Sequence, residues 1–107
     1  MAEIDLTDST FDAELKKSDI LVVDLWAEWC APCKMLGPVI ADLTREFDGK
    51  AMMAKVDIDS NPAITTRFGV SSIPTLLFFK KGELADRLTG AHPRHAIAEK
   101  IQKLLAS

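Results

Sequence analysis

Only two cysteines occur among the 107 residues of this chain, and several other features that would define its class are absent. No run approaches the roughly 18 consecutive apolar residues that a membrane-spanning helix requires, so we expect no membrane association. The net charge of -3 gives no general attraction to nucleic acid, which we also do not expect as a partner. Neither a Gly-x-Gly-x-x-Gly pattern nor a Walker loop occurs, so we expect the chain to carry no cofactor of its own.

The remaining composition is that of a folded domain. Repeats, low-complexity tracts and linkers are missing, and 48% of the residues are hydrophobic. We therefore expect a single domain over residues 1–107 with a packed core. The first residues, Met1 to Asp5, are acidic and no apolar signal segment follows them, which predicts a cytoplasmic protein. In that compartment a close pair of cysteines is more often catalytic or metal-binding than structural.

The two cysteines, Cys30 and Cys33, follow directly on the apolar run Ile20–Trp26. The run predicts a buried strand, and a helix can begin just after it, where unpaired backbone N–H groups favour a negative charge. This environment lowers the pKa of a thiol, and we expect one sulfur to face outward. A disulfide between the two closes only a tiny ring and stabilises the fold little. The pair therefore indicates redox chemistry, in which the second thiol resolves a mixed disulfide intramolecularly.

Zinc binding is the alternative for these cysteines. Cys30 and Cys33 together with His92 and His95 supply four possible ligands. However, the two pairs lie far apart in the sequence and their spacing is not that of a zinc finger. We therefore expect no metal, and we expect both histidines to lie at the surface without a catalytic role.

The hydrophobic pattern predicts an α/β fold with a central mixed sheet covered by helices on both faces. Thr7 is a candidate cap for the first helix, and Pro38 is expected to kink the second. The pattern predicts helices over 7–17, 33–47, 62–69 and 93–105, and strands over 20–26, 52–58, 75–80 and 84–89.

Several motifs in this order resemble the thioredoxin family from end to end. They are the run 23–35, Pro38, the strand 55–59, Ile73-Pro74-Thr75, the turn 79–82 and Gly90-Ala91. The resemblance implies the thioredoxin fold, with the element order βαβαβαββα. One residue departs from the family pattern, because Ala31 stands where glycine is usual. Ala31 and Pro32, between the cysteines, are expected to tune the redox potential, which cannot be carried over from the family.

The resemblance also implies roles for the site residues. Cys30 would be the nucleophile and Cys33 the resolving thiol. Asp24 interrupts an apolar strand, and burial there would raise its pKa toward neutrality. The family implies that Asp24 accepts the proton of Cys33, through water, with Lys55 as its partner. The alternative for Lys55 is a strand lysine whose stem is buried and whose amine reaches solvent.

A substrate groove is implied beside the cysteines. The family predicts a cis peptide bond before Pro74, facing Cys30, which leaves the backbone of Ile73 free to pair with an extended substrate. The expected groove residues are Trp29, Ile73, Pro74, Gly90 and Ala91.

The resemblance implies a protein-disulfide reductase, and we expect a monomer because nothing in the sequence argues against one. Its partners would be proteins that contain disulfides and a flavin-dependent thioredoxin reductase that draws on NADPH. Two other functions stay open at this stage: an oxidant or isomerase on the same fold, and a binding subunit that uses the groove without the thiols.

Overall fold

A computed structural model describes residues 3–107 of the chain. Within these residues nine elements follow one another in the order βαβαβαββα, as the resemblance implies. They are β1 (Ile4–Asp5), α1 (Phe11–Lys17), β2 (Ile20–Trp26), α2 (Ala31–Glu46), β3 (Met52–Asp57), α3 (Pro62–Arg67), β4 (Thr75–Lys80), β5 (Glu83–Thr89) and α4 (Arg94–Ala106). No helix among these residues is long and apolar enough to cross a membrane.

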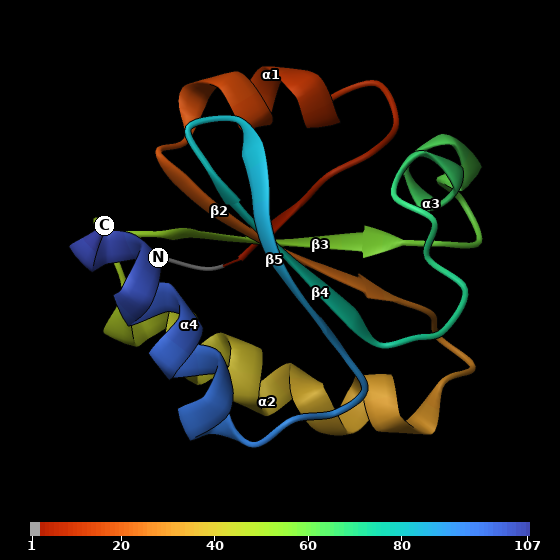
Figure 1. Cartoon of the computed structure of the whole chain (residues 1–107). Helices are drawn as coiled ribbons and strands as arrows, with labels where there is room; N and C mark the ends of the chain where they lie inside the picture. The colour runs from red at the N-terminus through yellow and green to blue at the C-terminus, as the bar shows by residue number, and fades with distance from the viewer. Residues whose placement is uncertain (1–2) are drawn as a thin grey trace.

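The five strands form one mixed sheet in the order β1-β3-β2-β4-β5. β3 pairs in parallel with both β1 and β2, whereas β4 is antiparallel to β2 and to β5. β2 and β4 are central strands and are buried on both faces, which explains why their sequences are apolar without alternation. Figure 1 shows the sheet between two layers of helices.

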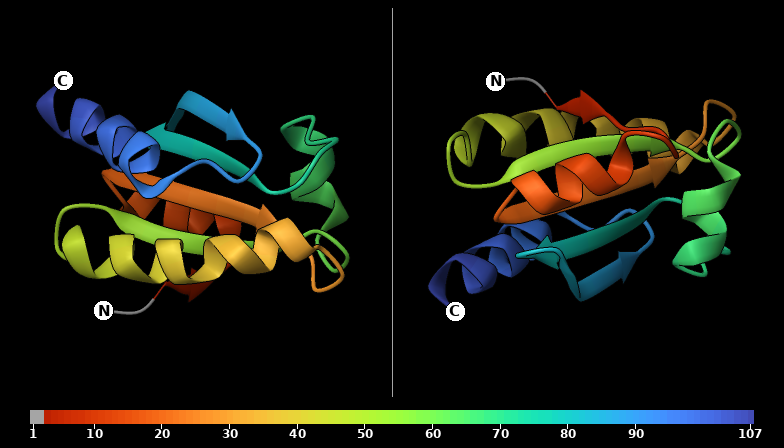
Figure 2. Two further views of the ribbon diagram at one scale, coloured as in Figure 1. Left: turned by 90° about the horizontal axis from the view of Figure 1, so that it is seen from below. Right: turned by 90° about the horizontal axis from the view of Figure 1, so that it is seen from above.

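Each face of the sheet has its own apolar core. On one face, α2 and α4 cover side chains such as Val22, Met53 and Phe78. On the other face, α1 and α3 cover Leu25 and Phe79 among others. The two views of Figure 2 show α2 and α4 in front of the sheet from below and α1 in front from above. The two layers hold β2 in the middle of the molecule, so the end of β2 is a rigid place for a site.

The start of α1 differs from the prediction. Thr7 does not cap a helix that begins beside it, because residues 8–10 form a turn and α1 begins at Phe11. The Thr7 main-chain N–H donates to the Thr10 hydroxyl at 2.9 Å. The Thr10 side chain therefore stabilises this turn, and Thr7 does not act as a helix cap. The carboxylate of Asp8 accepts from the N–H groups of Ala63 and Ile64 at the start of α3. This long-range contact ties the turn before α1 to the first turn of α3.

The other predicted elements are confirmed with small shifts at their ends. β4 has the predicted bounds, and Pro38 lies inside α2 as expected. α2 begins two residues earlier than predicted, at Ala31, because Cys30 occupies the N-cap position and Pro32 fits the first turn of a helix. This shift places both cysteines at one helix start.

Candidate functional site

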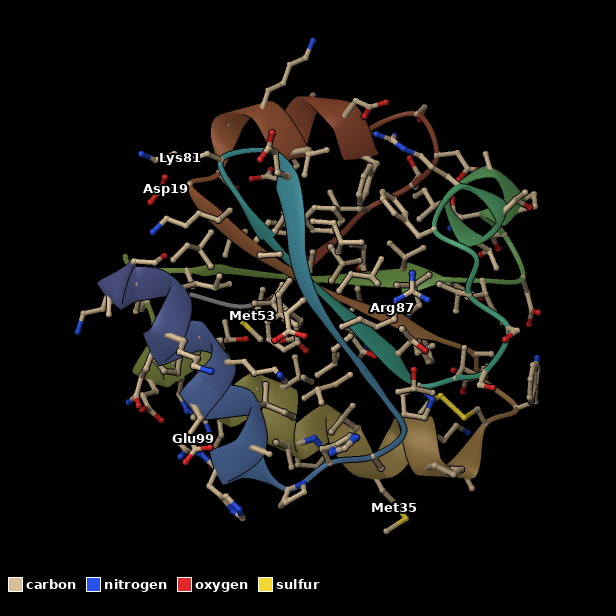
Figure 3. The ribbon with its side chains drawn as sticks, in the orientation of Figure 1. Asp19, Met35, Met53, Lys81, Arg87 and Glu99 are labelled. Carbon is tan, nitrogen blue, oxygen red and sulfur yellow. A yellow bond between two sulfur atoms is a disulfide. The ribbon has the colours of Figure 1, made fainter. Side chains whose placement is uncertain are left out.

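The two cysteines meet where β2 ends and α2 begins. Cys30 is the N-cap residue of α2, and Cys33 lies in its first turn. Their sulfurs are joined in a disulfide, with the two Cα atoms 5.3 Å apart. Figure 3 shows this bond in yellow at the N-terminal end of α2. The only two cysteines of the chain therefore form one redox-capable pair, held at the end of the central strand.

The helix start contributes a hydrogen-bond donor to the first sulfur. The main-chain N–H of Cys33 donates to Sγ of Cys30 at 3.3 Å. Pro32 has no N–H, so it adds no competing donor in this turn. Free N–H groups and the helix dipole both favour negative charge at this position. The geometry therefore favours a thiolate on Cys30 when the disulfide is reduced.

Both cysteines are buried, whereas the sequence predicted that the sulfur of Cys30 would face outward. Cys30 is 6% exposed and Cys33 is 3% exposed, so neither sulfur stands out into solvent in the disulfide state. The loop before β4 covers the pair, and Sγ of Cys30 lies 3.9 Å from the carbonyl oxygen of Ile73. The peptide bond between Ile73 and Pro74 is cis, as the resemblance predicts. In this disulfide state Cys30 is buried, contrary to the expected outward sulfur, because the cis-proline loop lies against it.

Asp24 lies inside β2 and is almost completely buried, with 2% of its surface exposed. Among the residues described, its Oδ1 atom has no hydrogen-bond partner. Burial raises the pKa of Asp24 to about 7, while the positive charge of Lys55 acts in the opposite direction. Asp24 and Lys55 are direct partners in the pairing of β2 with β3. The Lys55 amine also lies 4.3 Å from the centre of the Trp26 ring.

A cleft is lined by both Asp24 and Cys33. Asp24, Cys33 and Lys55 line it together with Trp26, Glu28, Lys34 and Gly37. A buried carboxyl group with a pKa near neutrality has the properties of a general base.

The expected groove residues come from three segments around the disulfide. Trp29 is 68% exposed, which confirms its predicted place at the surface. Its indole N–H donates to Oδ2 of Asp59 at 3.0 Å. On the other side, Gly90 N–H donates to the carbonyl of Pro74 at 2.8 Å, which ties the segment after β5 to the cis-proline loop. Ile73 is half-buried and packs against the cysteines, and Ala91 is exposed.

Ala31 and Pro32, between the cysteines, are both exposed. Both residues belong to the first turn of α2, which begins beside Cys30. The side chain at either position therefore affects this start of the helix. Their expected influence on the redox potential stays a prediction.

Sequence reasoning missed two residues near the site. Met35 is 74% exposed, and Figure 3 shows it pointing away from α2. The helical spacing contained this signal, because Leu36 and Ile40 define the inward face of α2 and Met35 lies outside it. Asp59 had no comparable signal, since its contact with Trp29 links distant parts of the chain.

The zinc alternative is not supported by the geometry. Within residues 3–107, no three His, Cys, Asp or Glu side chains gather as a metal-binding group. A ring nitrogen of His92, Nε2, lies 2.9 Å from the carbonyl oxygen of Thr89, within hydrogen-bond distance. His95 is exposed at the start of α4.

Comparison with known proteins places these features in a family. The thioredoxin family model matches residues 2–103. The chain is 47% identical to the thioredoxin of Staphylococcus saprophyticus over 105 residues, which cover 98% of this chain and 100% of that protein. It is 46% identical to thioredoxin 2 of Chlorobaculum tepidum over 98 residues, which cover 91% of this chain and 90% of the relative. It is 42% identical to the thioredoxin of Staphylococcus aureus strain Mu50 over 105 residues, which again span 98% and 100%.

Proposed function

This chain belongs to the thioredoxin family. From that premise we propose the role of each site residue in the reduction of disulfides. The protein is a thiol-disulfide oxidoreductase that reduces protein disulfides by dithiol-disulfide exchange through Cys30 and Cys33. Our proposal assigns Cys30 as the nucleophile and Cys33 as the resolving thiol. The observation that carries it is the hydrogen bond from the Cys33 N–H to Sγ of Cys30. This donor favours the thiolate on Cys30, the cysteine that must attack first.

Reduction proceeds in two exchanges. The Cys30 thiolate attacks one sulfur of a substrate disulfide, and the first substrate thiolate leaves as the mixed disulfide forms. Cys33 then loses its proton and its sulfur attacks Sγ of Cys30, which expels the second substrate thiolate. Two electrons pass to the substrate, and the Cys30–Cys33 disulfide remains. The second exchange is fast because both sulfurs belong to one helix start, so no second molecule has to be positioned.

Asp24 is the proton acceptor for Cys33 in this scheme. Its pKa of about 7 means that the carboxylate form is available near neutral pH while the group remains basic enough to accept a proton. The cleft that both residues line supports transfer through water. Lys55 tunes Asp24, because its positive charge lowers the pKa that burial has raised.

The substrate is held in extended form across Trp29, Ile73, Pro74, Gly90 and Ala91. The half-buried Ile73 supplies backbone groups beside the cysteines, which a substrate strand can use as hydrogen-bond partners. Trp29 supplies the largest exposed apolar surface of these residues. Backbone pairing does not depend on the substrate's side chains, so this mode suits a reductase with many protein substrates. Pro32 and Ala31 set the redox potential through the helix start.

The partners follow from the family. They are disulfide-containing proteins and a thioredoxin reductase, which we propose to be a flavoprotein that uses NADPH to reset the Cys30–Cys33 disulfide. We propose that the protein works as a monomer in the cytoplasm, where a reductant of this kind has its electron supply. Nucleic acid and membranes have no part in the scheme, and the chain needs no cofactor.

The test is the reduction of insulin by dithiothreitol, followed by the same assay with a thioredoxin reductase and NADPH. The parental protein should accelerate insulin precipitation in both assays, and Cys30→Ser should abolish the effect. Cys33→Ser should accumulate a mixed disulfide with insulin, visible by mass spectrometry, whereas Cys30→Ser should not. A reduction potential near or above that of the glutathione pool would instead favour an oxidant.

A further inference from the structure

The indole of Trp29 is tied to a loop that comes much later in the chain. Trp29 is 68% exposed, so packing alone leaves its ring free to adopt several rotamers. Its Nε1–H donates to Oδ2 of Asp59 at 3.0 Å. Asp59 lies between the end of β3 and the start of α3, two elements that Figure 1 shows meeting at one edge of the molecule. The position of this loop therefore selects the orientation of the ring.

The conformation of the loop is set first by Asp57. The main-chain N–H of Asp59 donates to Oδ1 of Asp57 at 2.9 Å, and the N–H of Ser60 donates to the Asp57 carbonyl at 3.3 Å. An aspartate that bonds the backbone two residues later forms a compact turn. This turn directs the side chain of Asp59 toward the indole.

Asn61 closes the loop from its other end. The residue is 5% exposed, and both its amide nitrogen and its amide oxygen form hydrogen bonds. The Nδ2 group donates to the Asp57 carbonyl at 2.9 Å, and Oδ1 accepts from the Asp8 main-chain N–H at 2.9 Å. A buried amide that satisfies partners on two segments holds them at a defined separation.

Asp8 then anchors the assembly to α3. Its Oδ2 accepts from the N–H of Ala63 at 3.1 Å, and its Oδ1 accepts from the N–H of Ile64 at 3.0 Å. The turn before α1 is therefore bonded both to Asn61 and to the first turn of α3. Hydrogen bonds run without a break from this turn to the indole beside Cys30.

We propose that Asn61 and Asp8 are positioning residues for substrate docking, acting through Asp59 on Trp29. Together they hold the loop in the one conformation that presents the Asp59 carboxylate to the indole and fixes the ring as a platform beside the disulfide. The role of Asn61 and Asp8 in substrate docking rests on the proposed function. Their effect on the orientation of the Trp29 indole does not.

The experiment begins with the indole, because its readout needs no activity. In a ¹⁵N-labelled sample, Asp59→Ala identifies the Trp29 indole N–H as the resonance that moves upfield and exchanges faster with water. Asn61→Ala should move the same resonance in the same direction. Asn61→Asp keeps the acceptor for Asp8 but replaces the donor to Asp57 with a charge, so it should do the same in a nearly isosteric side chain.

Asp12→Asn is the matched control. Asp12 accepts from Arg67 at 2.8 Å and so also links the α1 region to α3, but it bypasses the loop. This variant should leave the indole resonance where it is. An unmoved resonance in folded Asn61→Ala or Asn61→Asp would overturn the proposal.

The second readout is a double-mutant cycle on the rate constant for the reaction of the reduced protein with insulin. Asp59→Ala and Asn61→Ala should each lower it by about five-fold, the effect of losing one hydrogen bond. The double variant should be no slower than the slower single variant, because both changes remove the same contact. Multiplicative effects would overturn the proposal, as would an equal loss in Asp12→Asn. Failure of the parental protein to reduce insulin would instead refute the proposed function and leave the indole result standing.

Discussion

Asp24 and Lys55 stand opposite each other on the adjacent parallel strands β2 and β3, yet Oδ1 of Asp24 has no hydrogen-bond partner in the described part of the chain. The Lys55 amine lies over the Trp26 ring instead. The carboxyl group is therefore buried and poorly compensated, which raises its pKa to about 7, against the pull of Lys55. A stabilising ion pair would have kept this carboxylate ionised and weakly basic. The observed arrangement costs stability and leaves a usable base.

Replacing Asp24 should slow the resolution of mixed disulfides. Asp24→Asn keeps the shape of the side chain but cannot accept the proton of Cys33, so we expect resolution near pH 7 to slow by about ten-fold or more. In the parental protein the rate should rise between pH 6 and 8 as Asp24 ionises. Rapid quenching followed by mass spectrometry measures the lifetime of the mixed disulfide. Asp19→Asn, in an exposed residue just before β2, serves as the control. Parental rates in Asp24→Asn across this pH range would refute the assignment.

The same residue should make stability depend on pH. The pKa of Asp24 is raised from 3.8 to about 7 by folding, so the folded state binds the proton more tightly than the unfolded state. Stability should therefore fall as pH rises from about 4 to 7 and then level off. Relative to Asp24→Asn, the oxidised parental protein should lose up to roughly 4 kcal/mol across this window. Urea denaturation of both proteins at several pH values measures the difference, and a difference independent of pH would contradict it.

Trp29 should matter for protein substrates and little for small ones. Trp29→Ala removes an exposed platform, so we expect the rate with insulin to fall about ten-fold, the scale of a residue that dominates an interface. The rate with hydroxyethyl disulfide, which is too small to span the groove, should stay within about two-fold. Leu84→Ala, at a 44% exposed leucine on β5, is the control and should alter neither rate. Equal losses with both substrates would show that Trp29 acts on the chemistry of the cysteines and not on docking.

Asp8 should contribute to stability as a helix cap supplied from a distance. Asp8→Ala removes the acceptor for two N–H groups of α3, and such a loss costs about 1 to 2 kcal/mol. Asp8→Asn keeps one acceptor oxygen and should lose less. Chemical denaturation at pH 7 gives the free energies of unfolding. A loss in Asp8→Ala no larger than in Asp8→Asn would argue against the cap.

The sequence by itself determined most of the elements and pointed to the chemistry, although its pattern gave no strand at Ile4–Asp5. The apolar run Ile20–Trp26 can only be a central strand, and the spacing of Leu36, Ile40 and Leu43 can only put one face of α2 inward. The bounds of β4 also followed directly. Cys30 and Cys33 indicated redox exchange because they are close neighbours at the end of a strand. These features depend on hydrophobic periodicity, on secondary-structure propensity and on the spacing of residues close in the sequence. They can therefore be predicted without knowing which distant segments pack against them.

Only the tertiary structure decided which distant residues serve the site. Thr7 has the right chemistry for a helix cap, but α1 begins only at Phe11, and the turn before it is bonded through Asp8 to the start of α3. Asp59 accepts a hydrogen bond from the Trp29 indole, and Asn61 accepts one from the Asp8 main-chain N–H. Each of these contacts joins segments that lie together only in the folded protein. The sequence around either partner therefore gives no sign of the contact. A hydrogen bond between distant residues exists only once the chain has folded, so its partners cannot be found from spacing alone.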